Sequence, residues 1–233
     1  MISVIVPSRG RPREFGRLQE SLEWLASDTK SYFIQLGLDR DDISTCGYTS
    51  YSHHVYYNMT QEHVRPSIAA WTNLLAFRSP ADYYLICGDD YVMRTHGWDK
   101  TLPARCIHDI GAAYPDDCYN HKPTAILVPH AFVEVLGYLA WPKLKRWYID
   151  AWIEDVCRRA GMLTYVPEVK FEHMHLFAGK AERDATYDLA CIDGVPSDDV
   201  LSDKREYENG YRIREREARK LVAWVQARRG AVA

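Results

Sequence analysis

The stretch Tyr83–Asp90 (YYLICGDD) constrains the fold more than any other, because an apolar run ends abruptly at two adjacent carboxylates. A short run with no polar face is typical of a strand that is buried on both sides. Open α/β sheets bind ligands at the carboxyl ends of such strands. Adjacent carboxylates at that edge need a positive partner, and a divalent cation with oxygen ligands is the natural candidate. The alternative is a polar turn, since Gly-Asp-Asp also suits a turn.

Apolar runs alternate with amphipathic segments, which predicts an α/β fold. Strands are expected at Ile2–Pro7, Tyr32–Leu38, Tyr83–Asp90, Gly111–Pro115, Thr124–Val128, Leu163–Val166 and Val169–His173. Helices are expected from Pro12, from Pro66, over His130–Leu139, over Asp150–Ala160 and over Asp203–Arg229, the last weakened at Asn209-Gly210. We expect one domain over residues 1–180, followed by a C-terminal lid segment and a basic amphipathic helix over residues 181–233.

Composition excludes several classes of protein. A net charge of −3 over 233 residues gives no overall attraction to nucleic acid or to anionic membranes. Six cysteines without a CxxC pair favour reduced, buried thiols over a disulfide framework or a zinc site. No apolar run approaches the ~20 residues of a membrane span, and the N-terminus enters a strand without a signal-peptide pattern. We therefore expect a cytoplasmic protein with no membrane span.

The loop Ser8-Arg9-Gly10-Arg11 joins the first expected strand to the first expected helix. A strand, a Ser/Gly/Arg loop and a helix N-terminus together make an anion-binding element. The loop is neither a GxGxxG motif nor a P-loop, so its pattern alone indicates a nucleotide only weakly. The alternative, that Arg9 and Arg11 are solvated loop cations, stays equally open.

Two further segments carry chemistry-bearing side chains. The helix expected over Asp150–Ala160 contains Asp150, Glu154 and Asp155, of which the first two share a face at i, i+4 spacing. The simplest interpretation of Glu154 and Asp155 is that they pair with Arg158 and Arg159 on a solvated face. His173 and His175 lie at i, i+2 spacing on an extended segment, where both project to the same side and could ligate a metal.

The stretch from Tyr83 to Asp99 resembles the metal-binding acidic motif of GT-A-fold glycosyltransferases, especially the family 2-like forms of bacteria and phages. The resemblance implies the GT-A fold, a Rossmann-like mixed, mostly parallel sheet flanked by helices. In those enzymes a strand ends in Asp-X-Asp or a close variant, and a Trp-Asp pair often follows, as Trp98-Asp99 does here. Gly88 stands where the first acid would be. By position, the resemblance gives Asp90 the role of metal ligand and Asp89 a ribose-binding or supporting role.

The resemblance also implies a site for a nucleotide-sugar donor. A strand that ends in Pro-Ser lies under the base in the relatives, an Asp after the second strand reads the N3–H of uracil, and an Asn precedes the acidic strand. A lid that begins after the metal-binding histidine covers the donor. The donor-binding residues implied in this way are Pro7, Ser8, Arg9, Arg11, Asp39, Asn73, Asp89 and Lys180.

The catalytic base in these relatives lies eleven residues before the Gly that ends its helix. Counting back from Gly161 identifies Asp150, with Asp155 as the rival because it belongs to the acidic pair that looks more like the motif. The relatives often complete the metal site with a His after the following strand. His173 is the first candidate and His175 the second, and one of them could instead bind the donor phosphate.

The implied activity is transfer of a sugar from a nucleotide-sugar, UDP-linked by preference, to an acceptor hydroxyl with Mn²⁺ or Mg²⁺ as cofactor. An inverting mechanism is slightly favoured over a retaining one. A nucleotidyltransferase of similar fold and, in view of Gly88, a non-catalytic sugar- or nucleotide-binding module are the alternatives. The acceptor could be a glycan, a small molecule or modified DNA. An apolar stripe on the C-terminal helix (Ala218, Leu221, Trp224, Val225) could dock on the core or form a homodimer.

Overall fold

The computed structural model describes residues 1–48, 55–57, 67–188, 191–192 and 195–232, and within them eight strands form one mixed sheet in the order β3-β2-β1-β4-β7-β6-β8-β5. These strands are β1 (Ile2–Ser8), β2 (Tyr32–Leu38), β3 (Val55–Tyr57), β4 (Tyr83–Ile86), β5 (Tyr91–Met93), β6 (Ala112–Asp116), β7 (Ile126–Pro129) and β8 (Leu163–His173). Parallel pairing joins β1 to β2 and β4, β2 to β3, and β6 to β8. The antiparallel pairs are β4–β7, β6–β7 and β5–β8. The predicted mixed, mostly parallel sheet is confirmed.

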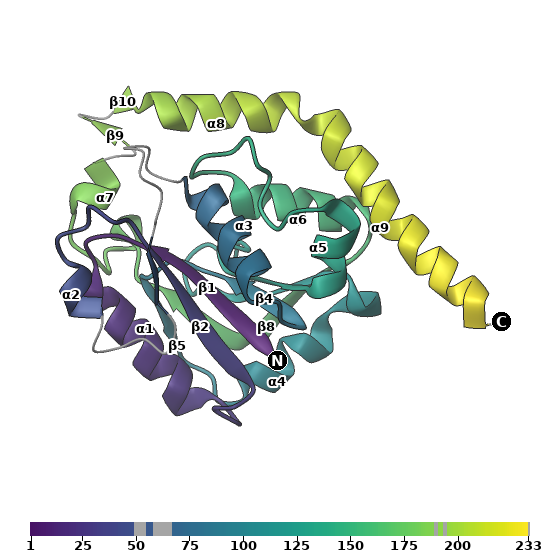
Figure 1. Ribbon diagram of the computed structural model, residues 1–233, viewed down its shortest axis with the longest axis horizontal. Helices are drawn as coiled ribbons and strands as arrows, with labels where there is room; N and C mark the ends of the chain where they lie inside the picture. Colours follow the sequence, from purple (N-terminus) through teal and green to yellow (C-terminus); the bar gives the residue numbers. More distant parts are fainter. Residues whose placement is uncertain (49–54, 58–66, 189–190, 193–194, 233) are drawn as a thin grey trace.

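Helices cover both faces of this sheet (Figure 1). The longer ones are α1 (Pro12–Leu25), α3 (Ile68–Arg78), α5 (His130–Leu136), α6 (Ile149–Arg159), α8 (Asp198–Asn209) and α9 (Tyr211–Val232). The shorter elements are α2 (Thr45–Tyr48), α4 (Trp98–Thr101), α7 (Ala185–Asp188), the 3₁₀ turns Pro103–Arg105, Ile107–Asp109 and Leu176–Ala178, and a ribbon of β9 (Cys191–Ile192) and β10 (Val195–Pro196).

Alternation along β1 explains why the sheet is buried on both sides. Val4 and Val6 face one apolar cluster, which includes Phe15 of α1, whereas Ile5 faces the other, which includes Trp71 of α3. A strand that is apolar on both faces can lie only between two layers of helices. The helices end where their sequences indicate: Ser67 caps α3 by accepting the Ala70 N–H at 3.0 Å, and Gly161 follows α6 with a left-handed φ of 69°.

The two strands expected on either side of Pro167 form one continuous strand, β8. Val166 is the partner of Pro115, but the next partners are Lys170 and Asp116, so the register shifts across the intervening residues. Proline cannot donate a ladder hydrogen bond and is tolerated at such an irregularity. The prediction of two strands was therefore wrong, because the bulge accommodates Pro167 without ending the strand.

The C-terminal helices pack on the rest of the chain. Leu221 and Val225 of α9 lie in the same apolar cluster as Trp152 of α6, so the predicted stripe docks on the core. The predicted weak point at Asn209-Gly210 is the junction of α8 and α9, where a Cβ on Gly210 would lie 2.5 Å from the Trp152 ring. Only glycine fits this close approach.

None of the described helices has the length and apolarity needed to cross a bilayer.

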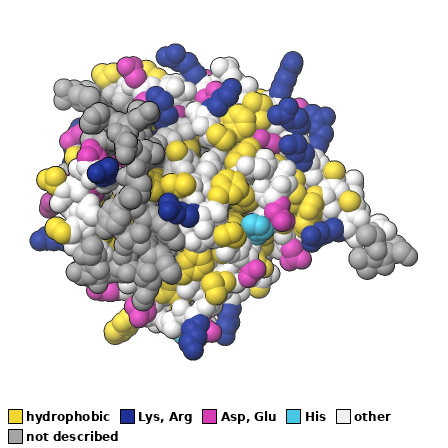
Figure 2. Space-filling view, in the orientation of Figure 1, with side chains coloured by type: hydrophobic (Ala, Val, Ile, Leu, Met, Phe, Trp, Pro, Cys, Tyr) yellow, Lys and Arg dark blue, Asp and Glu magenta, His cyan; other side chains and the backbone are white. Residues whose placement is uncertain are grey.

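Most basic side chains of α8 and α9 point to solvent, along the edge of the molecule that these helices form (Figure 2). The exposed ones are Lys204, Arg205, Arg212, Arg216, Arg219, Lys220, Arg228 and Arg229. Arg214 is the exception: it is 4% exposed, and its Nε donates to Asp155 of α6 at 2.6 Å. A solvated face therefore accounts for all of these charges except the one that ties α9 to α6.

We predict that Leu221→Ala lowers the free energy of unfolding by about 2–5 kcal/mol, because it removes a fully buried side chain from between α9 and the core. Leu201→Ala on α8 is the matched control: that leucine is 37% exposed, and its loss should cost less than about 0.5 kcal/mol. Urea denaturation of both variants measures the difference. Equal losses would show that α9 contributes no core contact.

Candidate active site

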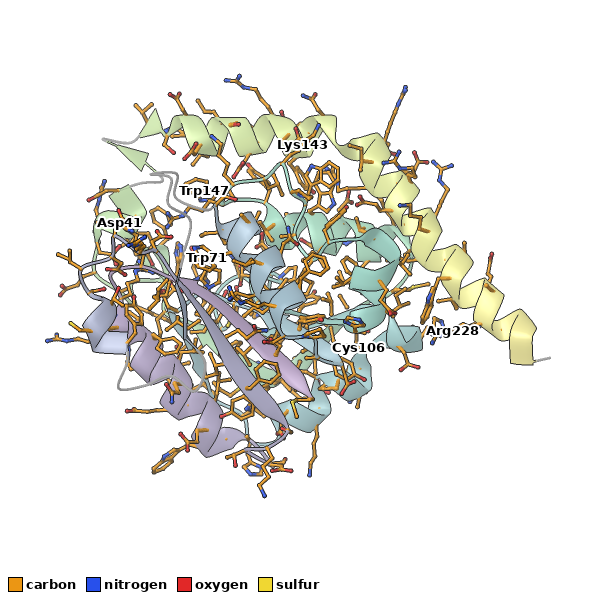
Figure 3. The ribbon with its side chains drawn as sticks, viewed as in Figure 1. Asp41, Trp71, Cys106, Lys143, Trp147 and Arg228 are labelled. Atoms are coloured by element: carbon orange, nitrogen blue, oxygen red, sulfur yellow. The ribbon has the colours of Figure 1, made fainter. Side chains whose placement is uncertain are left out.

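The loops that follow β1, β2 and β4 meet at the carboxyl edge of the sheet, where Figure 3 shows Asp41 and Trp71. Asp89 lies at this edge and is only 5% exposed. Its carboxylate accepts hydrogen bonds from the Ser8 hydroxyl at 2.5 Å and from Arg11 Nη1 at 3.2 Å. Pro7 is adjacent in β1, in register with Gly37 of β2. The predicted neighbours Pro7, Ser8 and Asp89 are thus brought together.

Arg11 is the cation that balances the acidic pair. Its Nη1 lies 3.2 Å from Asp89 Oδ1 and 3.3 Å from Asp90 Oδ2. Its Nε and Nη2 donate to the two oxygens of Asp184 at 2.7 and 2.9 Å, although Asp184 is 173 residues away in sequence. The Arg11 side chain is 8% exposed, so the alternative of a solvated loop cation does not hold for it.

Asp90 and His173 come together because β5 pairs with β8, which places Tyr91 opposite His173. The two rings stack with centroids 4.3 Å apart and an interplanar angle of 12°. His173 Nε2 then lies 3.4 Å from Asp90 Oδ1. Two bonds of about 2.0–2.1 Å to a shared Mg²⁺ can bridge that separation, so this pair fits a divalent cation.

His175 is next to His173 but has a different local role. The two rings meet edge to face with centroids 4.8 Å apart, and His175 Nδ1 accepts the Phe177 N–H at 3.2 Å, which begins the 3₁₀ turn Leu176–Ala178. Burial, followed by the nearby charge of His173, lowers the pKa of His175. A neutral ring near neutral pH suits either a structural role or ligation.

The pKa values of Asp89 and Asp90 shift in opposite directions. Burial, together with the charge of Asp90, raises the pKa of Asp89 to about 7 despite the opposing effect of Arg11. Burial also opposes ionisation of Asp90, but the hydrogen bond and charge of His173, together with Arg11, outweigh it and lower the pKa of Asp90. Asp90 is therefore the carboxylate that stays ionised. Gly88 leaves room for it, because a Cβ there would lie 2.7 Å from Asp90 Oδ1.

Asp150 lies in the first turn of α6 and is half-buried. Burial, followed by repulsion from Glu154, raises its pKa, while the charge of His173 acts in the opposite direction. Of the candidate metal ligands, His173 is the one whose charge acts on the Asp150 carboxylate. Asp150 is therefore an acid that burial weakens, the property that a general base needs.

Asp155, the rival, does not face that site. Its Oδ2 accepts from Arg159 at 2.9 Å and from Arg214 at 2.6 Å, so it joins α6 to α9. Glu154 pairs with Arg158 on the same helix. The ion pairs expected for Glu154 and Asp155 are confirmed, with Arg214 as an unpredicted third partner.

Asp39 follows β2 and is held between two donors. Its Oδ1 accepts from Trp71 Nε1 at 3.0 Å, and its Oδ2 accepts from Arg9 Nη1 at 3.0 Å. Arg9 also binds Asp41 through two hydrogen bonds of 2.7 and 3.1 Å. The Asp39 side chain keeps 12% of its surface exposed, at the same edge as Ser8.

Asn73 has its amide engaged by backbone. Nδ2 donates to the Ala140 carbonyl at 2.7 Å, and Oδ1 accepts the N–H groups of Leu139 and Ala140 at 2.8 and 2.9 Å. These bonds tie α3 to the segment after α5. A direct contact of Asn73 with a donor would have to replace one of them, so that assignment stays a prediction.

Lys180 lines a cavity together with residues of the site. Its ammonium pairs with Glu172 Oε1 at 2.7 Å and donates to the Cys118 carbonyl at 3.1 Å, which fixes the turn after β8. The cavity measures about 370 Å³. Its lining residues are Arg11, Glu14, Arg17, Asp90, Met174, Lys180, Ala181, Glu182, Arg183, Asp184 and Tyr187.

Arg146 is a half-buried cation that the sequence did not single out. It precedes α6 in an irregular segment. Burial and the charge of Arg11 lower its pKa, whereas the charges of Asp89 and Asp184 oppose that shift. Its guanidinium lies over the Trp147 ring, with Cζ 5.3 Å from the ring centroid. Neither a motif nor a periodic pattern marks Arg146 or Asp184, so only the fold could reveal them.

A second acidic group, Asp116, Asp117 and His121, has oxygen and nitrogen atoms close enough to hold an ion. Its atoms are already hydrogen-bonded, however. Asp117 Oδ1 accepts three backbone N–H groups of residues 119–121, and Asp116 binds both His121 and Lys170. The Lys170 ammonium already neutralises the Asp116 carboxylate. This group therefore stabilises its own loop, and Asp90–His173 is the better candidate for a metal site.

The chain was compared with known proteins. No protein-family model matches the sequence, and no curated protein matches it. Solved structures do match the fold. Mannosyltransferase PcManGT from Pyrobaculum calidifontis, solved with GDP-Man and Mn²⁺, has a TM-score of 0.58 at 10% identity, over 100% of this chain and 75% of its own. Glucosyl-3-phosphoglycerate synthase from Mycobacterium tuberculosis, solved with Mg²⁺ and UDP, has a TM-score of 0.56 at 11% identity, over 82% and 74%.

S. aureus TarS is also similar. Its 1–349 fragment, solved with UDP-GlcNAc, has a TM-score of 0.56 at 12% identity, over 78% of this chain and 61% of that one. The match spans 36% of a longer TarS chain. At such low identities the likeness concerns the fold alone. The chain has the GT-A fold, which confirms the fold expected from the sequence.

We predict that Asp90→Asn weakens Mn²⁺ binding by more than about tenfold, because even the partners that orient metal ligands contribute that much. His121→Ala, which removes a 65% exposed side chain from the second acidic group, should leave Mn²⁺ affinity unchanged. Calorimetry in the presence of a nucleoside diphosphate compares the two variants. If His121→Ala weakened Mn²⁺ binding and Asp90→Asn did not, the metal site would lie in the loop of residues 116–121.

Proposed function

We propose that this chain is a glycosyltransferase that moves a sugar from a nucleoside-diphosphate sugar, UDP-linked by preference, to an acceptor hydroxyl. One observation carries the proposal: side chains from separate segments converge at the carboxyl edge of a GT-A sheet. They comprise a buried acidic pair, its compensating cation and a histidine, namely Asp89, Asp90, Arg11 and His173.

The donor's base would lie against the ends of β1 and β2. Asp39 is the group that would read it, since a carboxylate only accepts hydrogen bonds and the uracil N3–H is a donor. Trp71 and Arg9 each use one of its oxygens. A carboxylate has about four lone-pair sites, so it can accept a further bond from a base without losing these two.

A divalent cation would be held by Asp90 and His173, whose separation of 3.4 Å suits a shared ion. When bound, Mn²⁺ or Mg²⁺ supplies Lewis-acid neutralisation of the diphosphate. Arg11 keeps the acidic pair balanced and binds Asp184, and in this way it holds the segment after β8 across the site. We propose this segment as the lid expected from the sequence.

Asp150 would act as general base. Its carboxylate takes the proton from the acceptor hydroxyl while that oxygen attacks the anomeric carbon of the donor sugar. The bond between that carbon and the diphosphate oxygen breaks, and the nucleoside diphosphate leaves with the electron pair. The raised pKa of Asp150 makes it a better proton acceptor than an ordinary aspartate. Attack from the face opposite the leaving group inverts the anomeric configuration.

The first experiment identifies donor and product together. Thermal-shift measurements with UDP- and GDP-sugars, with and without Mn²⁺, test for metal-dependent donor binding. The product released on incubation with candidate acceptors then decides the class. Release of a nucleoside diphosphate supports a glycosyltransferase, release of pyrophosphate identifies a nucleotidyltransferase, and binding without turnover or metal dependence identifies a binding module.

Asp39→Ala should weaken UDP binding by roughly 1–3 kcal/mol, the usual loss for a hydrogen bond to a charged group. Asp41→Ala is the matched control, because Asp41 also binds Arg9 but its side chain is 55% exposed. Calorimetry with UDP should find the control close to wild type. If Asp39→Ala binds UDP as tightly as wild type does, the uridine assignment fails.

Asp150→Asn should lower kcat by about 10²–10⁴-fold and leave donor affinity intact, because a base acts in the transition state. Only the carboxylate accepts a proton, so wild-type kcat should fall as pH drops through the raised pKa of Asp150. This acidic limb should vanish in Asp150→Asn.

Asp155→Asn controls for the loss of a carboxylate from the same helix and should keep most of its activity, with thermal melts checking that both variants are folded. If Asp155→Asn were inactive and Asp150→Asn active, Asp155 would be the general base. Two active variants, with a product that retains the donor's anomeric configuration, would establish a retaining mechanism without this base.

A further inference from the structure

Two exposed aromatic side chains lie beside the candidate metal site. Phe177, in the 3₁₀ turn after β8, is 77% exposed, and Tyr119, in the loop between β6 and β7, is 42% exposed. Both contact the His175 ring: the Phe177 centroid lies 5.3 Å from it, and Tyr119 stacks on it at 6.1 Å with an interplanar angle of 19°. His175 in turn meets His173 at 4.8 Å. We call Tyr119, His175 and Phe177 the aromatic platform; it adjoins a candidate metal ligand.

Backbone contacts hold both exposed rings in place. Asp117 Oδ1 accepts the three successive N–H groups of residues 119–121 at 3.0, 3.0 and 2.8 Å. Cys118 in this loop has a left-handed φ of 55°, a conformation that is strained for a residue with a Cβ. His175 Nδ1 accepts the Phe177 N–H at 3.2 Å. Such strain persists where surrounding contacts fix it, and it is concentrated at ligand-binding sites.

The charges around the platform favour a neutral ligand over a polyanion. Lys170 and Lys180 reach the loop of residues 116–121 from β8 and from the turn after it, and each is paired with a carboxylate. Lys170 pairs with Asp116, and Lys180 pairs with Glu172 at 2.7 Å. Nucleic acids gain most of their affinity from cations that neutralise phosphates. Lysines already neutralised by carboxylates offer little of that attraction.

A sugar ring matches both the apolar and the polar parts of this surface. Its C–H face can lie on an aromatic ring, whose face is electron-rich and attracts the polarised hydrogens. Its hydroxyl groups need hydrogen-bonding partners at the rim of the platform. His121, whose side chain is 65% exposed, and the Tyr165 hydroxyl lie there, with 3.3 Å between Nδ1 and the hydroxyl oxygen.

We propose that the aromatic platform binds the acceptor and that this acceptor is a neutral glycan, with sugar rings on Phe177 and Tyr119. The inference deepens the proposed function and rests on it. A glycan on the platform has its hydroxyl groups next to His173, on the side from which an acceptor must approach the donor. The second acidic group also gains a function, since Asp117 fixes the backbone that carries Tyr119.

Titration of the full chain with oligosaccharides tests the proposal. The probes are α- and β-linked oligomers of glucose, mannose and N-acetylglucosamine, together with a single-stranded DNA oligonucleotide, each with and without UDP and Mn²⁺. Phe177→Ala and Tyr119→Ala each remove one ring, and Phe177→Tyr keeps a ring at that position. Phe77→Ala is the matched control, because Phe77 is a 56% exposed phenylalanine on α3. Affinity for UDP alone is measured for every variant.

We expect wild-type protein to bind at least one of the oligosaccharides. Phe177→Ala and Tyr119→Ala should each bind it about threefold to tenfold more weakly, the scale of one aromatic stacking contact. Phe177→Tyr and Phe77→Ala should bind it like wild type. All four variants should keep wild-type affinity for UDP, because the platform holds the acceptor and not the donor.

The proposal is overturned if wild-type protein binds UDP but none of the oligosaccharides, or if both ring-removing variants bind them undiminished. A parallel loss of UDP affinity would also overturn it, since the platform would then belong to the donor site. Binding of the oligonucleotide in place of the oligosaccharides, lost in Phe177→Ala, would identify a nucleobase as the ligand. Wild-type protein that binds an oligosaccharide but neither UDP nor GDP would instead overturn the proposed function.

Discussion

The arrangement of the candidate site depends on how the negative charges of two adjacent buried carboxylates are neutralised. Asp89 and Asp90 follow β4 and are shielded from water, a situation that is strongly unfavourable without opposite charge and hydrogen bonds. The partners come from distant segments: Ser8 at the end of β1, Arg11 in the loop that follows it, and His173 at the end of β8. The need to neutralise one dipeptide thus fixes the relative positions of three strands. A site built in this way cannot form before the sheet does.

Much of this arrangement could be predicted from the sequence. Local signals were sufficient for β1, β2 and β4, because a buried parallel strand is a continuous apolar run and its end is marked by polar residues. The acidic pair stood out for the same reason. The resemblance to GT-A enzymes favoured Asp150 over Asp155 through the spacing to Gly161, and the structure adds that Asp155 forms an ion pair with Arg214.

The remaining features depend on contacts that no local pattern encodes. Arg146 and Asp203 meet through backbone N–H groups, which every residue except proline has, so neither side chain carries a recognisable signature. Asp184 looks like any loop acid until Arg11 is found beside it. Pro167 suggested a break between strands, because a bulge can be recognised only when the partner strand is known. The sequence therefore predicted elements better than it predicted the partners that join them.

The stack of Tyr91 on His173 bears on how a cation would be bound. With its centroid 4.3 Å from the Tyr91 ring and nearly parallel to it, the imidazole is already held with Nε2 toward Asp90. Its rotamer freedom is lost when β5 pairs with β8, during folding, and not when an ion arrives. A ligand that is ordered in advance raises affinity without adding any contact, which is preorganisation in its simplest form. In a site with few carboxylate ligands, this rigidity can replace part of the metal affinity that further negative charges would have provided.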